Sequence, residues 1–267
     1  MSGRGTALAP RFALIVIVVV LGSDVGEAQW PRQRSNLPRT ADGRVDLNAP
    51  APRMPDGRPA LSGVWEQYSE FEPPKYLLDI AADLKPADVP LRPWARDLLQ
   101  QRRANNGADH PGARCLPSGI PEKNAVPAPI KIVQTPELVV LLYESRTIFR
   151  QVFTDGRSLP PADVQPTWQG YSVGRWEGDT FVVNTAGFNG QTWLDMSGHP
   201  ATEALRVTER FTRKTIGRID LEITIDDPRA YTRPWTVSQR LRLLPEDELI
   251  EHICEENNKA PVQIYGK

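Results

Sequence analysis

The chain has 267 residues, 40% of which are hydrophobic, and a formal net charge of −1. A chain of this length buries enough surface to fold without a metal ion or a lattice of disulfides. Its basic residues alternate with acidic ones and form no long basic run, which excludes the usual charge pattern of a nucleic-acid-binding protein. We therefore expect a globular protein that binds no nucleic acid.

Residues 1–28 have the pattern of a secretion signal. Arg4 and Arg11 lie before or at the start of an apolar run at 12–21, and the segment ends in Gly-Glu-Ala at 26–28. Small residues at these last positions are what signal peptidase recognises, so we expect cleavage after residue 28. An apolar run of about ten residues is too short to span a bilayer. The sequence thus predicts a periplasmic or secreted protein with no transmembrane span in the mature chain.

Cys115 and Cys254 are the two cysteines of the chain. An even pair in an oxidising compartment is a candidate disulfide. Two separate buried thiols are the alternative. Neither cysteine lies in a setting typical of a catalytic nucleophile, so we expect no cysteine chemistry.

Residues 29–60 are rich in proline and arginine and lack apolar periodicity. Asp-Gly-Arg triplets at 42–44 and 56–58 are typical of turns. We expect an extended arm that is either laid over the domain or mobile. The pattern changes at 61–68, where alternation predicts the first strand of a single domain that continues to residue 267.

Alternating apolar and polar runs dominate the rest of the chain. One helix is predicted from about Pro93 to Asn105, because proline suits the first helical turn and Asn106-Gly107 suits the end. After residue 129 the further predicted strands are 130–134, 138–144, 147–153, the two arms of a hairpin in 170–188, 205–211, 219–225, 235–243 and 249–254. About ten strands with short connections favour an all-β fold, an antiparallel meander that closes into a lipocalin-like barrel and so hides its edges. A two-sheet sandwich is the alternative.

Glu209 shares one face of its predicted strand with Leu205, Val207 and Phe211, so we expect it to point inward. A buried carboxylate must be paired or neutral, because burying a lone charge is very costly. The candidate partners are Arg146, Arg150, Arg175 and Arg210. An internal salt bridge and an acid–base role in a ligand cavity are the two interpretations.

Asp195, His199 and Glu203 bring three possible metal ligands close together in sequence. Their spacing suits a metal site on a helix, but Gly198 and Pro200 argue against a helix there. Phosphate loops, dinucleotide fingerprints and the nucleophile elbow of serine hydrolases are missing from the sequence. We therefore expect neither a metal nor an organic cofactor.

Large aromatic residues gather at predicted strand ends and loops, where a ring can wall a pocket while its polar atom orients a ligand. They are Trp65, Trp168, Trp176, Trp193, Tyr231 and Trp235. Core packing explains any one of them equally well. We take them as candidate ligand-binding residues.

Short motifs run through nearly the whole chain after residue 28. They are DGRPALSGVW at 56–65, IPEKNAVP at 120–127, FTDGR at 153–157, GRWEGDT at 174–180, WLD at 193–195, GHP at 198–200, ERF at 209–211, DDP at 226–228 and YTRPW at 231–235. Together they resemble a large family of exported bacterial proteins of unassigned function. Phe181 stands where that family has a short aliphatic residue. The resemblance implies no particular activity.

Three functions remain open. The leading hypothesis is binding of a small apolar or amphipathic molecule inside the barrel, with tryptophan and arginine residues at its mouth. The second is a hydrolase, lyase or isomerase that works without a metal; Glu209 or Asp195 would be its acid or base, His199 would carry protons, and Arg146 or Arg210 would stabilise negative charge. The third is an envelope scaffold that docks a partner through its aromatic loops.

Overall fold

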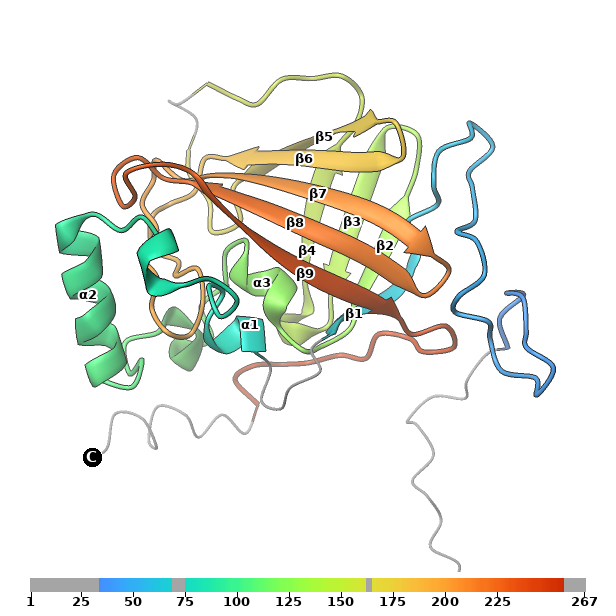
Figure 1. The fold of residues 1–267 in the computed structure, drawn as a ribbon, viewed down its shortest axis with the longest axis horizontal. Helices are drawn as coiled ribbons and strands as arrows, with labels where there is room; N and C mark the ends of the chain where they lie inside the picture. The colour runs from blue at the N-terminus through green and yellow to red at the C-terminus, as the bar shows by residue number, and fades with distance from the viewer. Residues whose placement is uncertain (1–33, 69–74, 162–164, 257–267) are drawn as a thin grey trace, which may run out of the picture. The chain divides into compact units, whose positions relative to one another are not determined.

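The computed structural model describes residues 34–68, 75–161 and 165–256, so the predicted signal sequence lies outside the described residues. Within these ranges nine strands form a closed barrel in which each strand pairs with the next and the last pairs with the first (Figure 1). The strands are β1 (Gly63–Tyr68), β2 (Ile130–Gln134), β3 (Leu138–Tyr143), β4 (Ile148–Phe153), β5 (Tyr171–Glu177), β6 (Thr180–Ala186), β7 (Arg206–Thr215), β8 (Arg218–Asp226) and β9 (Trp235–Leu243). The predicted all-β barrel is confirmed.

The pairing of β4 with β5, which we call the parallel seam, departs from the predicted antiparallel meander. β4 and β5 are parallel and pair only at Val152 with Ser172 and at Phe153 with Val173, whereas the other neighbouring strands are antiparallel. Parallel neighbours cannot be joined by a tight turn. The long connection from residue 154 to 170 therefore returns the chain to the same end of the barrel before β5 begins.

The strand predicted at 249–254 is wrong. β9 pairs with β1, so the barrel has no edge left for a tenth strand. The segment instead bonds to the turn before β4: the Ile250 amide donates to Glu144 Oε2 at 3.1 Å. A disulfide between Cys115 and Cys254 ties the same segment to the loop that follows α2.

The inside of the barrel is filled by side chains. Alternation along β9 sends Trp235, Val237, Leu241 and Leu243 inward, where all four are buried. Trp65 is completely buried on β1, and its indole N–H donates to the carbonyl of Leu61 at 2.9 Å. Packing of this kind leaves the apolar part of the interior to the protein's own residues.

The described residues include three helices, and α2 lies beside the left end of the barrel in Figure 1. The helices are α1 (Lys75–Leu78), α2 (Pro93–Ala104) and α3 (Glu122–Ala125). The helix predicted near 93–105 is α2, with Pro93 in its first turn. Three short 3-10 segments accompany them, η1 (Pro86–Asp88), η2 (Pro111–Arg114) and η3 (Ser145–Thr147). Within the described ranges, none of the helices has the length and apolar character needed to cross a bilayer.

Residues 34–60 form an extended arm laid on two turns of the barrel. Arg53 makes a bidentate pair with Asp179, in the β5–β6 turn, with N–O distances of 2.9 and 2.8 Å. The Ile216 amide, in the β7–β8 turn, donates to the carbonyl of Ala49 at 2.9 Å. The arm therefore covers the end of the barrel at which these turns lie.

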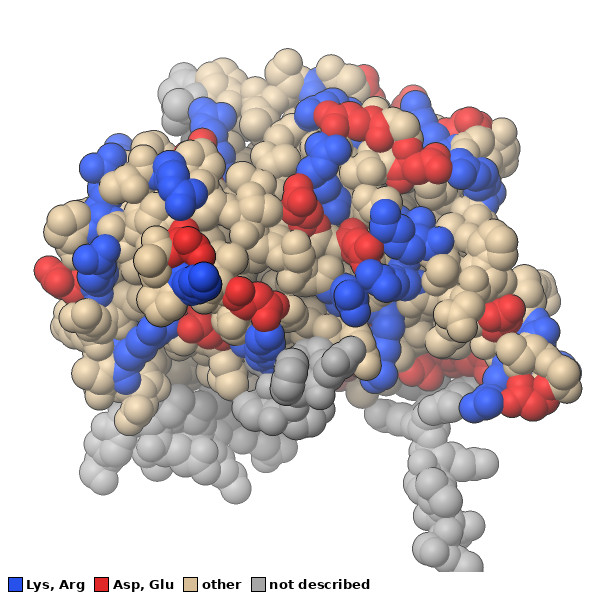
Figure 2. All heavy atoms as spheres, viewed as in Figure 1, with Lys and Arg blue, Asp and Glu red and all other residues tan. Residues whose placement is uncertain are grey.

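Figure 2 shows basic and acidic side chains interspersed over strands β7, β8 and β9. The register explains the mixture, because Arg210 lies opposite Glu222 and Asp220 lies opposite Arg240. Cross-strand pairs of opposite charge stabilise a sheet face modestly. This face carries no large field of one sign.

Candidate functional site

A polar network lies inside the barrel around Glu209, which points inward as predicted. Glu209 is completely buried and forms an ion pair with Arg150, from β4. Asn124, from α3, donates to Glu209 Oε1 at 2.6 Å. Arg150 also donates to Ser172 Oγ at 3.0 Å and to Thr185 Oγ1 at 2.7 Å. Four strands and a helix thus meet at one internal salt bridge.

The network satisfies Glu209 rather than leaving it reactive. Both carboxylate oxygens accept hydrogen bonds, and the charge is neutralised by Arg150. Burial raises the pKa of Tyr143 to about 12, so its hydroxyl stays protonated and donates to Asn124 Oδ1 at 3.0 Å. A carboxylate fixed this way makes a structural ion pair.

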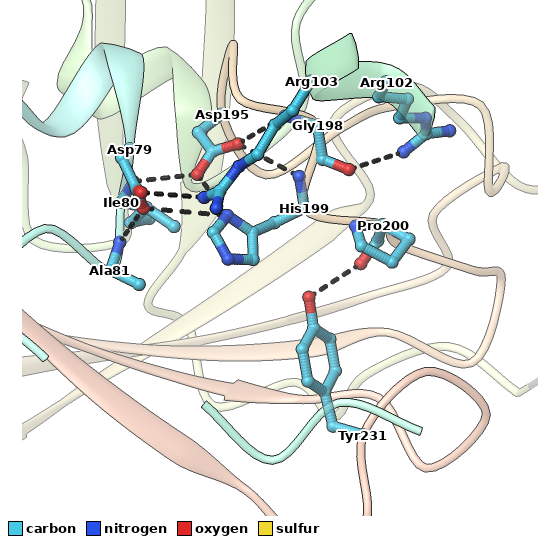
Figure 3. A network of polar contacts seen from close by, with 10 residues as sticks. All are labelled: Asp79, Ile80, Ala81, Arg102, Arg103, Asp195, Gly198, His199, Pro200 and Tyr231. Carbon is cyan, nitrogen blue, oxygen red and sulfur yellow. Dashed lines mark hydrogen bonds and ion pairs between the residues drawn. The ribbon is translucent and has the colours of Figure 1, made fainter. Parts of the chain in front are cut away.

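Asp195 and His199 form a second buried pair, drawn in Figure 3. His199 Nδ1 lies 2.6 Å from Asp195 Oδ2. The same carboxylate accepts the backbone amides of Ile80 at 2.8 Å, Gly198 at 2.9 Å and His199 at 3.1 Å. His199 is only 2% exposed. The pair therefore fastens the loop after β6 to the loop after α1.

Asp79 adds a third possible ligand atom to this cluster. Ligand atoms of Asp79, Asp195 and His199 lie within 4.8 Å of one another. However, Asp79 already pairs with Arg103 at 2.9 Å, and Nδ1 of His199 is engaged by Asp195. A cation here would meet the positive charge of Arg103 and would compete with both contacts. The cluster is better explained as a set of loop contacts, and Glu203 lies apart from it, paired with Arg229.

The three other arginines named as candidate partners of Glu209 lie elsewhere. Arg175 pairs with Glu177 at 2.6 Å. Arg146 donates to the carbonyl of Leu116 at 2.7 Å and to Ser118 Oγ at 3.0 Å, outside the Glu209 network. Arg210 lies on the outer face and pairs with Glu177 at 2.8 Å. The predicted acid–base residues therefore do not converge: the structure brings Asp195 to His199, and Glu209 to Arg150.

Most of the predicted aromatic residues are packing residues. Trp65, Tyr231, Trp235 and Trp193 are buried, and the Tyr231 hydroxyl donates to the carbonyl of Pro200 at 3.0 Å. Trp193 packs between His110 and Arg102 and also borders a small cavity beside α2. Trp176 lies against Phe181, with ring centroids 5.2 Å apart. Trp168 differs, because it lines a crevice in the barrel wall.

The crevice lies beside the parallel pairing of β4 with β5, which is limited to two residue pairs. Its volume is about 490 Å³, and it lies between β4 and the segment 167–172. The four aromatic residues that line it are Phe149, Phe153, Trp168 and Tyr171. Phe149 is 62% exposed, an unusual position for a phenyl ring on a strand. Arg150 and Ser172 connect the floor of the crevice to the internal network.

One side chain of the crevice offers a donor to a ligand. Gln169 Nε2 is buried and has no hydrogen-bond partner among the described residues. The site thus combines an aromatic wall with a buried amide donor that an acceptor on a ligand would satisfy.

Phe149, Phe153, Gln169 and Tyr171 were missed in the sequence, although one signal pointed to the two phenylalanines. Phe149 and Phe153 occupy outward positions of β4, since Arg150 and Val152 are the buried ones. Apolar residues on the outward register of a strand are candidates for a binding surface. The alternation of apolar and polar residues gave no sign that β4 and β5 are parallel.

Comparison of the chain with protein-family models and with curated proteins found no match.

Proposed function

We propose that this protein is exported and binds a small, largely apolar or amphipathic molecule, and that the molecule lies in the crevice between β4 and residues 167–172. The observation that carries the proposal is the aromatic wall of the crevice, with Phe149 held open to solvent. A volume of about 490 Å³ falls in the range of roughly 300–1,000 Å³ that small-molecule sites occupy.

The chemistry of the lining supports an amphipathic ligand. Aromatic rings favour a flat or aliphatic body that leaves water on binding. Gln169 Nε2 lacks a partner and would donate to an acceptor on the ligand. A buried donor without a partner costs about 1–3 kcal/mol, so a ligand that satisfies it gains specificity.

Two features favour this site over the interior of the barrel and favour binding over catalysis. Core side chains fill the apolar interior, where Trp65 and Phe211 are buried. The carboxylates of Glu209 and Asp195 both accept hydrogen bonds from neighbouring groups of the protein. The hydrolase, lyase or isomerase alternative therefore has no free carboxylate at either residue. An exposed Phe149 is also compatible with the scaffold alternative. The experiment below distinguishes ligand binding from a scaffold role.

The experiment is a titration with anilinonaphthalene sulfonate, an amphipathic dye that fluoresces in apolar surroundings. Phe149→Ser removes a crevice ring, and Val133→Ser is the control, because Val133 is also exposed on an outer face of the barrel but lies outside the crevice. We expect one saturable site, weakened about ten-fold by Phe149→Ser, since about 1.4 kcal/mol of apolar contact is lost. Equal affinity in all three proteins, or no saturable binding, would contradict the proposal and leave the scaffold interpretation.

A further inference from the structure

A second cavity adjoins the crevice, and together the two can hold a longer ligand than the crevice alone. Its volume is about 600 Å³, and its apolar lining includes Pro160, Pro166, Phe188 and Leu205. Thr167, Gly170 and Tyr171 line both cavities. The two cavities therefore adjoin at the segment that leads into β5.

This segment is held from the side of the second cavity. The Thr167 amide donates to the carbonyl of Gly187 at 2.9 Å, and the Asn189 amide donates to the carbonyl of Thr167 at 2.9 Å. Gly170 has a φ of +67°, and a Cβ there would meet the carbonyl of Ala186 at 2.8 Å. Any larger residue at 170 would therefore displace the chain between the two cavities.

An arginine lines the second cavity two strands away from Tyr171, since β5 pairs with β6 and β6 pairs with β7. Arg206, at the start of β7, lines the cavity and is exposed. It makes no ion pair and no side-chain hydrogen bond in the part of the chain that the structure describes, although Asp226 lies opposite it in the register. Arg229, also in the lining, is already paired with Glu203 at 3.1 Å. Arg206 is thus the cation of this lining that is available to an anion.

We infer that the ligand is an elongated single-chain anionic amphiphile of the long-chain carboxylate type. Its hydrocarbon chain would lie in the aromatic crevice and pass Tyr171, and its carboxylate would pair with Arg206 in the second cavity. The inference rests on the proposed function, because it gives a ligand class to the same site. It assigns to Arg206 a role in recognising the head group, since an arginine pairs well with a carboxylate.

The test compares sodium dodecanoate with dodecanol, which have the same chain and differ in charge, in wild type, Arg206→Gln and Arg240→Gln. Arg240 is the matched control, because it is an exposed arginine on β9 that lines neither cavity. Calorimetry below the micelle concentration should give dodecanoate about ten-fold tighter binding than dodecanol in wild type and in Arg240→Gln. Arg206→Gln should remove that preference, and added salt should weaken it in wild type.

A second variant tests the length of the site. Ala204→Trp places a large ring in the second cavity, which Ala204 lines. It should weaken dodecanoate more than hexanoate, with circular dichroism confirming that the variant is folded. Equal affinities for dodecanoate and dodecanol, or a preference that survives in Arg206→Gln, would overturn the assignment of the head group while the binding function stands. Absence of binding by either compound would overturn the inference and the proposed function together.

Discussion

Arg150 and Glu209 face each other inside the barrel from β4 and β7, with Arg150 Nη1 at 3.0 Å from Glu209 Oε1 and both side chains almost completely buried. The pair lies directly behind the crevice, because Arg150 also lines the crevice floor. It therefore fixes the inner surface against which a bound molecule would rest.

Breaking this pair should destabilise the protein strongly. Glu209→Gln leaves the Arg150 charge buried without a counter-charge, which costs about 3–5 kcal/mol. The double variant Arg150→Met with Glu209→Leu should lose less than the sum of the single variants Arg150→Met and Glu209→Leu, since no charge is left unpaired. Urea denaturation of the wild type and the variants measures the free energy of unfolding. Additive losses would show that the two charges do not depend on each other.

Removing the disulfide should lower stability without changing the barrel. Cys115 and Cys254 are separated by 139 residues in sequence, and closing a loop of that length stabilises a fold by at most about 5 kcal/mol. We expect Cys115→Ala with Cys254→Ala to lower the urea midpoint while the far-ultraviolet spectrum stays that of a β protein. Reduction of the wild type should reproduce the shift, and an unchanged midpoint in both experiments would contradict the structural role of the bond.

Removing the Asp195 carboxylate should destabilise the two loops that it joins. Asp195→Asn replaces one carboxylate oxygen by a donor that repels the backbone amides now bound there, so we expect a loss of about 1–3 kcal/mol. Asp97→Asn is the control, because Asp97 is exposed on α2. Hydrogen exchange should quicken at the amides of Ile80 and His199 in Asp195→Asn alone. Unchanged exchange there would show that the carboxylate does not hold the loops.

Lys123 should give the stability a pH dependence. It is buried in α3, and burial lowers its pKa to about 8, below the roughly 10.4 of an unfolded chain. Between these values the unfolded chain binds more protons, so the free energy of unfolding should rise with pH by up to about 1.4 kcal/mol per unit. Below pH 8 the lysine is charged in both states, and its burial cost is constant.

The measurement compares wild type with Lys123→Met from about pH 7.5 to 9.5, below the range in which unfolded tyrosines ionise. Wild type should gain stability relative to Lys123→Met as the pH rises. Lys131→Met is the control, because Lys131 is exposed on β2 and its removal should give a gap that does not change with pH. If the difference in the free energy of unfolding between wild type and Lys123→Met is also independent of pH, the lysine titrates in the folded protein as it does in water.

Alternation predicted most of the barrel, because inward and outward residues differ sharply in strands such as β9. It failed at 249–254, where the pattern is present but no strand edge remains to pair with. Alternation also failed to predict the burial of α3. Its residues Glu122, Lys123 and Asn124 are polar, and they find partners only in the folded protein. The inward direction of Glu209 was predictable from its strand, whereas its partner Arg150 was one of four candidates.

The crevice was harder to foresee for a physical reason. It depends on the direction in which β5 enters the barrel, and direction is set by how a long connection packs rather than by the periodicity of either strand. Trp168 was named as a candidate ligand-binding residue, but so were five other aromatic residues, most of which are buried. Only the structure separates a ring that lines a cavity from a ring that packs a core.

Fluorine NMR of protein labelled with fluorotryptophan would test the location of the site most directly. The Trp168 resonance, assigned with Trp168→Phe, should shift on addition of sodium dodecanoate or dodecanol, because Trp168 lines the crevice. The Trp65 resonance should stay in place, because Trp65 is sealed inside the barrel, and the Trp94 resonance should stay in place, because Trp94 lies on α2. A shift of Trp65 without Trp168 would put the ligand inside the barrel and contradict the account.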